Sequence, residues 1–371
     1  MSTQQRAALA PCIVAIAAAL LGACASGGAG GLFLGTVSGR VVDIGGSPVA
    51  NAAVRAENGA GTVTDGNGEF RLAGLRAGQQ ARVNFSAPDF AATTKVFPVL
   101  PGQDTRQDGI ILVSQGAPVS IDARTDATLA LPAGGRVRIP ANSLVRANGQ
   151  PASGMAVARV AVIDPRDFAQ VAAGPGELTI GSGAQQRPLT SGGMVRVQIT
   201  DASTGEALDL APGQRAAIDM PRSLITRTQW PVMGGRDFQF PPDTVPASSI
   251  YLFDLNTGAW RWVDTLTTTP GSNFVTGYTP TLGPWINLDK PEVRTCIDIQ
   301  VLKADGTPSV NVFVVAFGVD YNGYTRAFTD ATGRARLLAR RSSTVLVASS
   351  GKQQVVNTPG VETPCVNAGT L

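Results

Sequence analysis

The stretch "TVTDGNGEFRLAGL", residues 62–75, decides the fold, because short apolar and β-branched runs flank a turn that holds two glycines. From Asp65 onwards, acidic or amide side chains stand at every second position. A calcium loop of the EF-hand type needs a glycine at its sixth position and a glutamate at its twelfth. Counted from Asp65, these positions hold Phe70 and Arg76. We therefore expect a β-hairpin corner and no ion there.

The same plan returns near the end of the chain, where "FTDATGRARL", residues 328–337, echoes "VTDGNGEFRL", residues 63–72. In the second copy an arginine, Arg334, stands where the first copy has a glutamate. A set of calcium ligands does not survive that exchange, whereas a turn does. The turn needs only an aspartate, Asp330, that accepts bonds from nearby backbone, and a glycine, Gly333, at positive φ.

Composition indicates an all-β protein of more than one domain. The 371 residues include 43 Gly and 25 Pro, spread between runs rich in Val, Thr and Ile, as in chains of short strands and turns. This length suffices for two or three domains. The formal charge is only +3, and no basic run stands near interleaved aromatic residues, so nucleic acid is not an expected partner.

The N-terminus has the features of a secretory signal. Arg6 precedes the apolar run "AALAPCIVAIAAALLGA", which is too short for a membrane span. It ends in "LLGAC", which resembles the bacterial lipobox. The resemblance implies a signal peptide over residues 1–23 and lipid on the thiol of Cys24. An ordinary cleaved signal, with Cys24 incidental, is the alternative. Because Ala25 follows, the resemblance favours delivery to the outer membrane.

The domain plan follows from composition and from a second resemblance. Residues 24–35, rich in Gly, are expected to form a flexible tether. Residues 36–114 carry "SGRVVDIGGSPVANAAVRA", "TVTDGNGEFRLAGLRAG" and "VNFSAPDFAATTKVFPV", and they resemble the carboxypeptidase regulatory-like domain, which implies a seven-stranded prealbumin-like sandwich. Residues 291–371 contain the echo and are expected to form a second such sandwich. The predicted fold is thus a series of tandem β-sandwich, Ig-like domains.

Between the two copies, residues 115–290 read as a middle β-rich domain. The runs "VRIPANSLVRANGQPASGMAVARVAVIDPRDF" and "IYLFDLNTGAWRWV" resemble the central part of bacterial surface proteins with this layout, and a region of cartilage intermediate layer protein. Residues 226–247, rich in Pro, are the expected long loop.

The four cysteines divide cleanly. Cys12 lies in the signal and Cys24 in the lipobox, which leaves Cys296 and Cys365 as a pair. Outside the cytoplasm we expect this pair to be a disulfide. A metal site is the alternative, but two thiolates need further ligands, and the chain has no His.

The absence of His also removes His-based acid–base catalysis and Ser-His-Asp triads. The resembled domain carries no catalytic residue of its own, and neither a nucleophile elbow nor a P-loop is present. A Ser nucleophile with a Lys base, for which no motif is present, and two carboxylates meeting across a cleft are the enzymatic arrangements left open. We predict no enzyme, no metal and no cofactor.

Aromatic side chains are the candidate ligand contacts, since sugars stack on flat rings. Trp260 and Trp262 are two residues apart on a predicted strand and share one face. They are predicted either to pack in the core or to form a ligand platform. Tyr321 and Tyr324 lie in the polar loop "GVDYNGYTRA" and are the better surface candidates.

These features predict a non-catalytic, lipid-anchored protein of the bacterial cell envelope, periplasmic or surface-exposed. Its modules are expected to bind or adhere to a glycan or to another envelope protein, with a membrane as the partner of the anchor. The alternatives are a periplasmic structural subunit of an envelope assembly, which binds proteins only, and a cryptic glycan-acting hydrolase.

Overall fold

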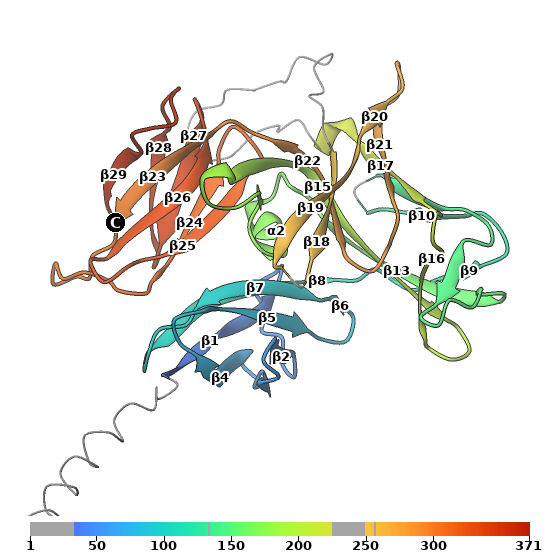
Figure 1. The fold of residues 1–371 in the computed structure, drawn as a ribbon, viewed down its shortest axis with the longest axis horizontal. Coiled ribbons are helices and arrows are strands. Elements are labelled where there is room, and N and C mark those ends of the chain that lie inside the picture. Colours follow the sequence, from blue (N-terminus) through green and yellow to red (C-terminus); the bar gives the residue numbers. More distant parts are fainter. Residues whose placement is uncertain (1–32, 133, 225–248, 256) are drawn as a thin grey trace, which may run out of the picture.

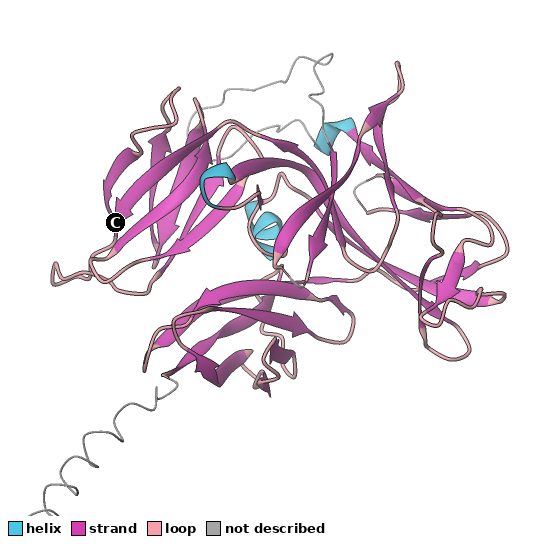
Figure 2. Cartoon of the chain, in the orientation of Figure 1, coloured by secondary structure: helices cyan, strands magenta, loops and turns pink. Residues whose placement is uncertain are grey.

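The computed structural model describes residues 33–132, 134–224, 249–255 and 257–371. Over these ranges the chain is built almost entirely of β-strands, which confirms the predicted all-β class (Figure 2). The expected signal peptide, Cys24 and most of the expected tether lie outside the described residues, as does the expected loop at 226–247.

The first module, residues 34–114, is a sandwich of two sheets. One sheet has the order β4-β1-β8-β6 and consists of β1 (Leu34–Asp43), β4 (Glu69–Arg76), β6 (Phe90–Ala91) and β8 (Asp104–Ser114). The other has the order β3-β2-β5-β7 and consists of β2 (Ala53–Ala56), β3 (Gly61–Val63), β5 (Gln80–Ser86) and β7 (Thr93–Pro98). Buried side chains of both sheets, including Val41 and Phe85, fill the space between them. Because β1 begins at Leu34, the last two residues of the expected tether belong to the sheet instead.

The third module, residues 294–371, repeats this topology. One sheet has the order β26-β23-β29 and consists of β23 (Arg294–Gln300), β26 (Arg334–Arg340) and β29 (Val366–Thr370). The other has the order β25-β24-β27-β28 and consists of β24 (Phe313–Gly318), β25 (Tyr324–Phe328), β27 (Thr344–Ser349) and β28 (Lys352–Asn357). In both modules the first strand pairs antiparallel on one side and parallel, with the last long strand, on the other. The repeat in the sequence is therefore a repeat in structure.

The predicted turn is present in both copies, but the strands on either side of it do not form the expected hairpin. Because β3 and β4 lie in different sheets, as do β25 and β26, the turn is a corner that carries the chain from one sheet to the other. Asp65 Oδ1 accepts the backbone N–H of Asn67 and of Glu69, each at 2.9 Å, and Gly68 has φ +75°. Asp330 Oδ1 accepts the N–H of Thr332 at 2.8 Å and of Arg334 at 3.0 Å, and Gly333 has φ +73°. The carboxylate is thus occupied in holding the turn, which is the role that the sequence predicted.

The middle module, residues 119–291, has two larger sheets. The first has the order β10-β11-β17-β21-β20 and consists of β10 (Ala127–Ala130), β11 (Arg136–Ile139), β17 (Ala216–Pro221), β20 (Thr267–Thr268) and β21 (Phe274–Thr279). The second runs β12-β16-β15-β22-β18-β19, with β13 and β14 also pairing with β15, and β9 with β13. Its strands are β9 (Val119–Asp122), β12 (Leu144–Arg146), β13 (Met155–Ile163), β14 (Thr179–Ile180), β15 (Arg187–Asp201), β16 (Ala207–Leu210), β18 (Ser249–Asp254), β19 (Ala259–Thr265) and β22 (Trp285–Pro291). The long strand β15 ties this sheet together.

A bridge between a strand and a following proline occurs in all three modules. In each, a backbone pair closes over a short turn that contains a glycine at positive φ. The bridges are Val42–Pro48, Val145–Pro151 and Leu302–Pro308. The middle module therefore shares a local device with its neighbours that its sequence did not lead us to expect.

The helix α2 (Phe168–Ala173) lies where the three modules meet (Figure 1). Asp167 caps its N-terminus by accepting the N–H of Ala169 at 2.9 Å. The other helical turns are η2 (Gly183–Gln185) and η3 (Arg222–Leu224). None of the helices in the described part of the chain has the length and apolar run that a bilayer crossing requires.

Contacts of α2 join it to both outer modules. Lys95 of β7 is fully buried, and its ammonium donates to the carbonyl of Ala172 at 2.8 Å and to that of Gly174. Burial, with the positive charge of Arg326 nearby, holds the pKa of Lys95 well below its usual value. On the other side, Phe168 stacks on Phe317 of β24 with ring centroids 4.6 Å apart.

The first and third modules also touch directly. Arg326 of β25, 6% exposed, donates to Gln107 Oε1 and to the carbonyl of Val96, both at 2.8 Å. Asn311 donates to Thr105 Oγ1 at 2.9 Å. One buried apolar cluster contains residues of all three modules, among them Ala91, Phe253 and Tyr324. The modules therefore form one folded cluster.

Candidate functional site

Three of the four aromatic candidates are buried, which corrects the prediction that Tyr321 and Tyr324 are surface contacts for a ligand. Trp260, Tyr321 and Tyr324 are each 3% exposed. The indole Nε1 of Trp260 donates to the carbonyl of Glu177 at 2.9 Å, and its ring packs edge-on against Phe253. Of the two readings given for Trp260, the core is correct.

The two tyrosines are buried in different ways: Tyr321 is covered by its own loop, whereas Tyr324 begins β25 and lies in the apolar cluster shared by the three modules. The ring of Tyr321 lies against the backbone of Gly318 and Gly323, where an added Cβ would come within 2.4 Å and 2.0 Å of the ring. Its hydroxyl accepts the N–H of Arg340 at 3.2 Å. Tyr324 packs against Phe317, with centroids 5.2 Å apart. Only a loop with glycines at these two positions can cover the ring of Tyr321 in this way.

Trp262 has a different environment from Trp260. It is 52% exposed and pairs in register with Tyr251 of β18. Of the predicted aromatic candidates, it is the one that the structure leaves at the surface.

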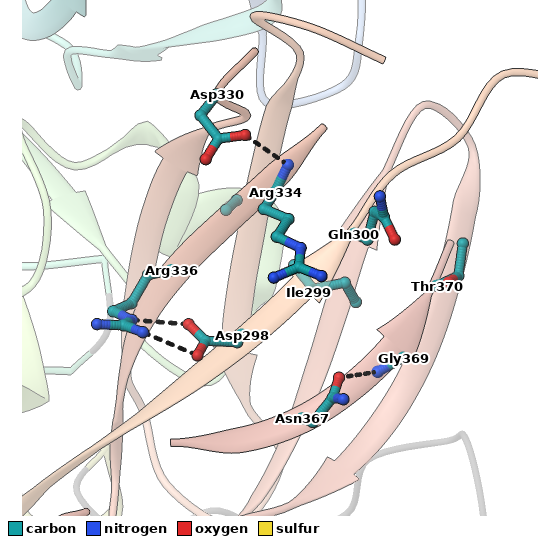
Figure 3. A pocket seen from close by; sticks show the side chains of 10 residues that line it. Asp298, Ile299, Gln300, Asp330, Arg334, Arg336, Asn367, Gly369 and Thr370 are labelled. Atoms are coloured by element: carbon teal, nitrogen blue, oxygen red, sulfur yellow. Dashed lines mark hydrogen bonds and ion pairs between the residues drawn. The ribbon is translucent and has the colours of Figure 1, made fainter. Parts of the chain in front are cut away.

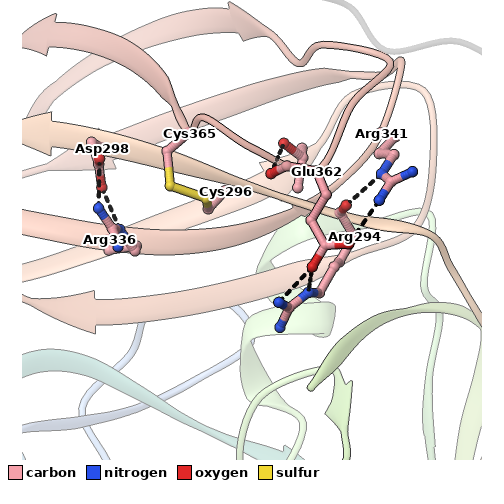
Figure 4. The surroundings of a disulfide bond; sticks show 8 residues. Arg294, Cys296, Asp298, Arg336, Arg341, Glu362 and Cys365 are labelled. Carbon is pink, nitrogen blue, oxygen red and sulfur yellow. Dashed lines mark hydrogen bonds and ion pairs between the residues drawn. A yellow bond between two sulfur atoms is a disulfide. The ribbon is translucent and has the colours of Figure 1, made fainter. Parts of the chain in front are cut away.

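The predicted disulfide is present. Cys296 in β23 and Cys365, just before β29, are joined with their Cα atoms 4.6 Å apart (Figure 4). Close by, Glu362 pairs with Arg294 at 2.5 Å and with Arg341 at 2.9 Å. The bond ties β29 to β23, which is the parallel pair that the first module forms without cysteines.

A polar groove of about 490 Å³ lies over this same sheet and is a candidate site (Figure 3). Its walls come from β23, β26 and β29 and from the Asp330 corner. The residues that line it are Asp298, Ile299, Gln300, Asp330, Arg334, Ala335, Arg336, Asn367, Gly369 and Thr370. None of the aromatic candidates is among them.

Both carboxylates of the groove are already engaged. Asp298 forms a two-point ion pair with Arg336, with N–O distances of 2.7 and 2.9 Å. This pairing raises the pKa of Arg336. Asp330 holds the corner, and the hydroxyl and backbone of Thr332 together with the backbone of Arg334 lower the pKa of its carboxyl. Asp298 is thus committed to an ion pair, and Asp330 to the turn.

The free hydrogen-bonding groups of the groove are mostly donors. Among the residues that the structure describes, none forms a hydrogen bond or ion pair with the guanidinium of Arg334. Asn367 Oδ1 accepts the N–H of Gly369 at 2.9 Å, and its amide nitrogen has no hydrogen-bond partner among the described residues. Gln300 donates to the carbonyl of Thr332 at 3.1 Å and keeps its oxygen as an acceptor. The groove thus offers a cation, an amide donor and the Thr370 hydroxyl.

The groove has a counterpart on the first module, where the residues at the equivalent positions form ion pairs with one another. The strand registers place Glu69 at the position of Arg334 and Arg106 at the position of Asn367. Glu69 and Arg106 form an ion pair of 2.9 Å across β1. Arg71 pairs with Asp104 at 2.7 Å. The hollow there, about 370 Å³, is lined by charges that are satisfied within the protein.

Sequence reasoning missed Arg334, Asn367 and Gln300 as functional candidates. The exchange of Glu69 for Arg334 is visible in the repeat, but it served only to exclude calcium. The signal would have been that the position of Arg334, on an exposed sheet face, takes part in an ion pair in the first module and has no such partner in the third. Recognising it requires the pairing register across β23, which depends on contacts distant in sequence.

Comparisons with known proteins give a partial sequence likeness. Cartilage intermediate layer protein 2 from Homo sapiens is 28% identical over 190 residues, which is 48% of this chain and 16% of that protein. The Mus musculus protein is 28% identical over 237 residues, 61% of this chain and 19% of that protein. The chain thus spans less than a fifth of these relatives.

Solved structures give only a remote likeness. The Bacillus anthracis TIE protein matches 91% of this chain and 49% of its own, with 9% identity and a TM-score of 0.20. BcpA, the major pilin subunit of Bacillus cereus, matches 91% and 99%, with 9% identity and a TM-score of 0.19. Scores this low do not establish a shared arrangement.

The family comparison concerns the first module. Its two-sheet packing is that expected of the resembled domain, but it has eight strands, β1 to β8, where the resemblance implied seven. Residues 36–112 match the family model of the carboxypeptidase regulatory-like domain.

Proposed function

We propose that this chain is a non-catalytic, lipid-anchored protein of the bacterial cell envelope whose β modules serve binding or adhesion, with a glycan as the ligand. The observation that carries the proposal is the groove of the third module, where donors stand uncommitted on a sheet that a disulfide ties together. The lipobox-like "LLGAC" around Cys24 is what supports the anchor.

The arrangement of the modules suits a binding role. A site on one module is held in a fixed position relative to the others, because α2, Lys95 and Arg326 join them through buried contacts. A rigid platform reduces the entropy lost on binding. Trp262, exposed on β19, remains a predicted second contact.

Binding is tested with the acylated chain, purified in detergent and applied to a glycan array that covers neutral and acidic saccharides. We expect at least one class of saccharide to bind, with no release of shorter fragments. Silence across the array, with capture of one defined envelope protein, would favour the periplasmic partner-binding alternative. Turnover that disappears on neutralising a pair of acidic residues would establish the hydrolase.

The anchor is tested by labelling cells with palmitate and comparing the native chain with Cys24→Ala. We expect label in the native chain only. Equal labelling of both, or of neither, would remove the anchor from the proposal. Protease treatment of intact cells then shows on which face of the outer membrane the modules lie.

A further inference from the structure

We infer that the groove on the β26-β23-β29 sheet binds a saccharide that carries a carboxylate, with Arg334 as the residue that recognises the charge. This inference rests on the proposed function and names the ligand class of its site.

The first step concerns charge. Arg334 is exposed on β26, and its guanidinium has no ion-pair partner within the described residues, while the other arginine of the groove, Arg336, is held by Asp298. A guanidinium presents two parallel N–H groups that match the two oxygens of a carboxylate. The charge of Arg334 contributes to lowering the pKa of the Asp330 carboxyl, but its N–H groups form no ion pair, so they favour an anionic group of that planar shape.

The second step concerns the groups around Arg334. Asn367 and Thr370 on β29 offer an amide N–H and a hydroxyl, and the side-chain oxygen of Gln300 on β23 offers an acceptor (Figure 3). A sugar ring carries hydroxyls that both donate and accept, so it can use this mixed set. The two apolar residues of the lining, Ile299 and Ala335, are only 2% and 5% exposed, so they offer little surface to an apolar side chain. This chemistry favours a saccharide over an acidic peptide.

The third step is the internal comparison. In the first module, Glu69 and Arg106 occupy the positions of Arg334 and Asn367 and satisfy each other across the central strand. In the third module the same two positions hold a cation, Arg334, and a neutral amide, Asn367. An anion from outside can therefore supply the negative charge that Glu69 supplies in the first module. The inferred ligand carboxylate thus takes the place of a side chain that the repeat has lost.

The repeat also supplies the test variants. Arg334→Glu introduces the residue of the first module and reverses the charge. The double variant Arg334→Glu/Asn367→Arg places both residues of the first module's ion pair in the groove and lowers the net charge by one, whereas Arg334→Glu alone lowers it by two. Arg76→Glu, at an exposed position on β4, makes the same charge change as Arg334→Glu outside the groove and is the control.

The experiment measures affinity of the full chain for polygalacturonate and for its methyl-esterified form, which has the same sugar without the charge, and for polyglutamate. We expect binding to polygalacturonate only. Arg334→Glu is expected to weaken it by at least about tenfold, because a charge-assisted pair contributes on that order. The double variant is expected to have the same melting temperature as the native chain but not to bind the polymer. Arg76→Glu is expected to bind it as the native chain does.

The outcomes separate this inference from the proposed function. Equal binding of the esterified polymer, or no effect of Arg334→Glu, overturns the inference while a glycan-binding function stands. Binding of polyglutamate as tightly as polygalacturonate identifies an acidic peptide and also overturns it. Failure to bind any saccharide on the array removes both.

Discussion

At the scale of single residues, the exposure of a side chain depends on neighbours that are distant in sequence. Tyr321 and Tyr324 stand in a stretch that reads as a polar surface loop, yet both rings are buried among strands of the third module and its neighbours. The decisive contacts are those of Gly318 and Gly323 with the ring of Tyr321. Polarity of the local sequence could not reveal them.

Burial of these tyrosines predicts their titration. Burial raises the pKa of Tyr321, Tyr324 and Tyr251 from 10.0 to about 12. An ultraviolet titration of the native chain is expected to show an absorbance change equivalent to three tyrosines only near pH 12. If all tyrosines of the folded chain ionised together around pH 10, the buried placement would be wrong.

Asp219 predicts how stability depends on acid. It is 1% exposed on β17, where burial alone would raise its pKa, but Arg136, Thr276 and Arg138 outweigh that effect and lower it. A carboxyl whose pKa is lowered by folding stabilises the fold at pH values above its pKa in the unfolded chain. This stabilisation is lost as pH falls through the pKa of the folded state.

The variant Asp219→Asn is therefore expected to unfold more easily at neutral pH, by about 2 kcal/mol for hydrogen bonds of a charged group. The difference from the native chain should shrink as pH falls below the unfolded value of 3.8. Urea denaturation at several pH values measures it. A difference that stays constant down to strongly acidic pH would contradict the assigned pairs.

At the scale of elements, turns formed by neighbouring residues could be predicted from the sequence, whereas the order of strands in the sheets could not. The Asp330 corner, with Gly333 at positive φ, follows from five consecutive residues, and the structure confirms it. The parallel pairing of β23 with β29 joins strands far apart in the chain. The groove depends on that pairing, so the sequence indicated its corner and not its walls.

The disulfide holds this pairing. Cys296 and Cys365 close a loop with a sequence separation of 69, which in the chain-entropy model stabilises the module by about 4 kcal/mol. The double variant Cys296→Ser/Cys365→Ser is expected to melt at lower temperature and to lose ligand affinity, because β29 carries Asn367 and Thr370. Unchanged melting in calorimetry would show that the bond contributes nothing.

At the scale of the whole molecule, the three modules are expected to behave as one unit. Arg326 reaches from the third module to Gln107 and Val96 of the first, and Lys95 reaches from the first to α2. The sequence indicated modules in series but left open whether they form a rod or a cluster. Contacts between residues more than 200 positions apart decide this, and no local pattern encodes them.

Replacement of the buried guanidinium tests that unit. Arg326→Gln removes the charge and leaves Gln107 without its partner, so the first and third modules should separate more easily. We expect calorimetry to show one transition for the native chain and two for the variant, with Arg336→Gln, an exposed arginine of the same module, as the control. Two transitions already in the native chain would mean that the modules melt independently.

The most direct test of the account combines anchor and groove in one flotation experiment. Lipid vesicles are mixed with the chain and with fluorescent polygalacturonate, and the floated fraction is measured. The native chain is expected to carry the polymer upward. Cys24→Ala should leave chain and polymer at the bottom, and Arg334→Glu should float without the polymer. If the native chain fails to float the polymer, or Arg334→Glu floats it equally well, a lipid-anchored protein that binds its ligand through this groove is the wrong description.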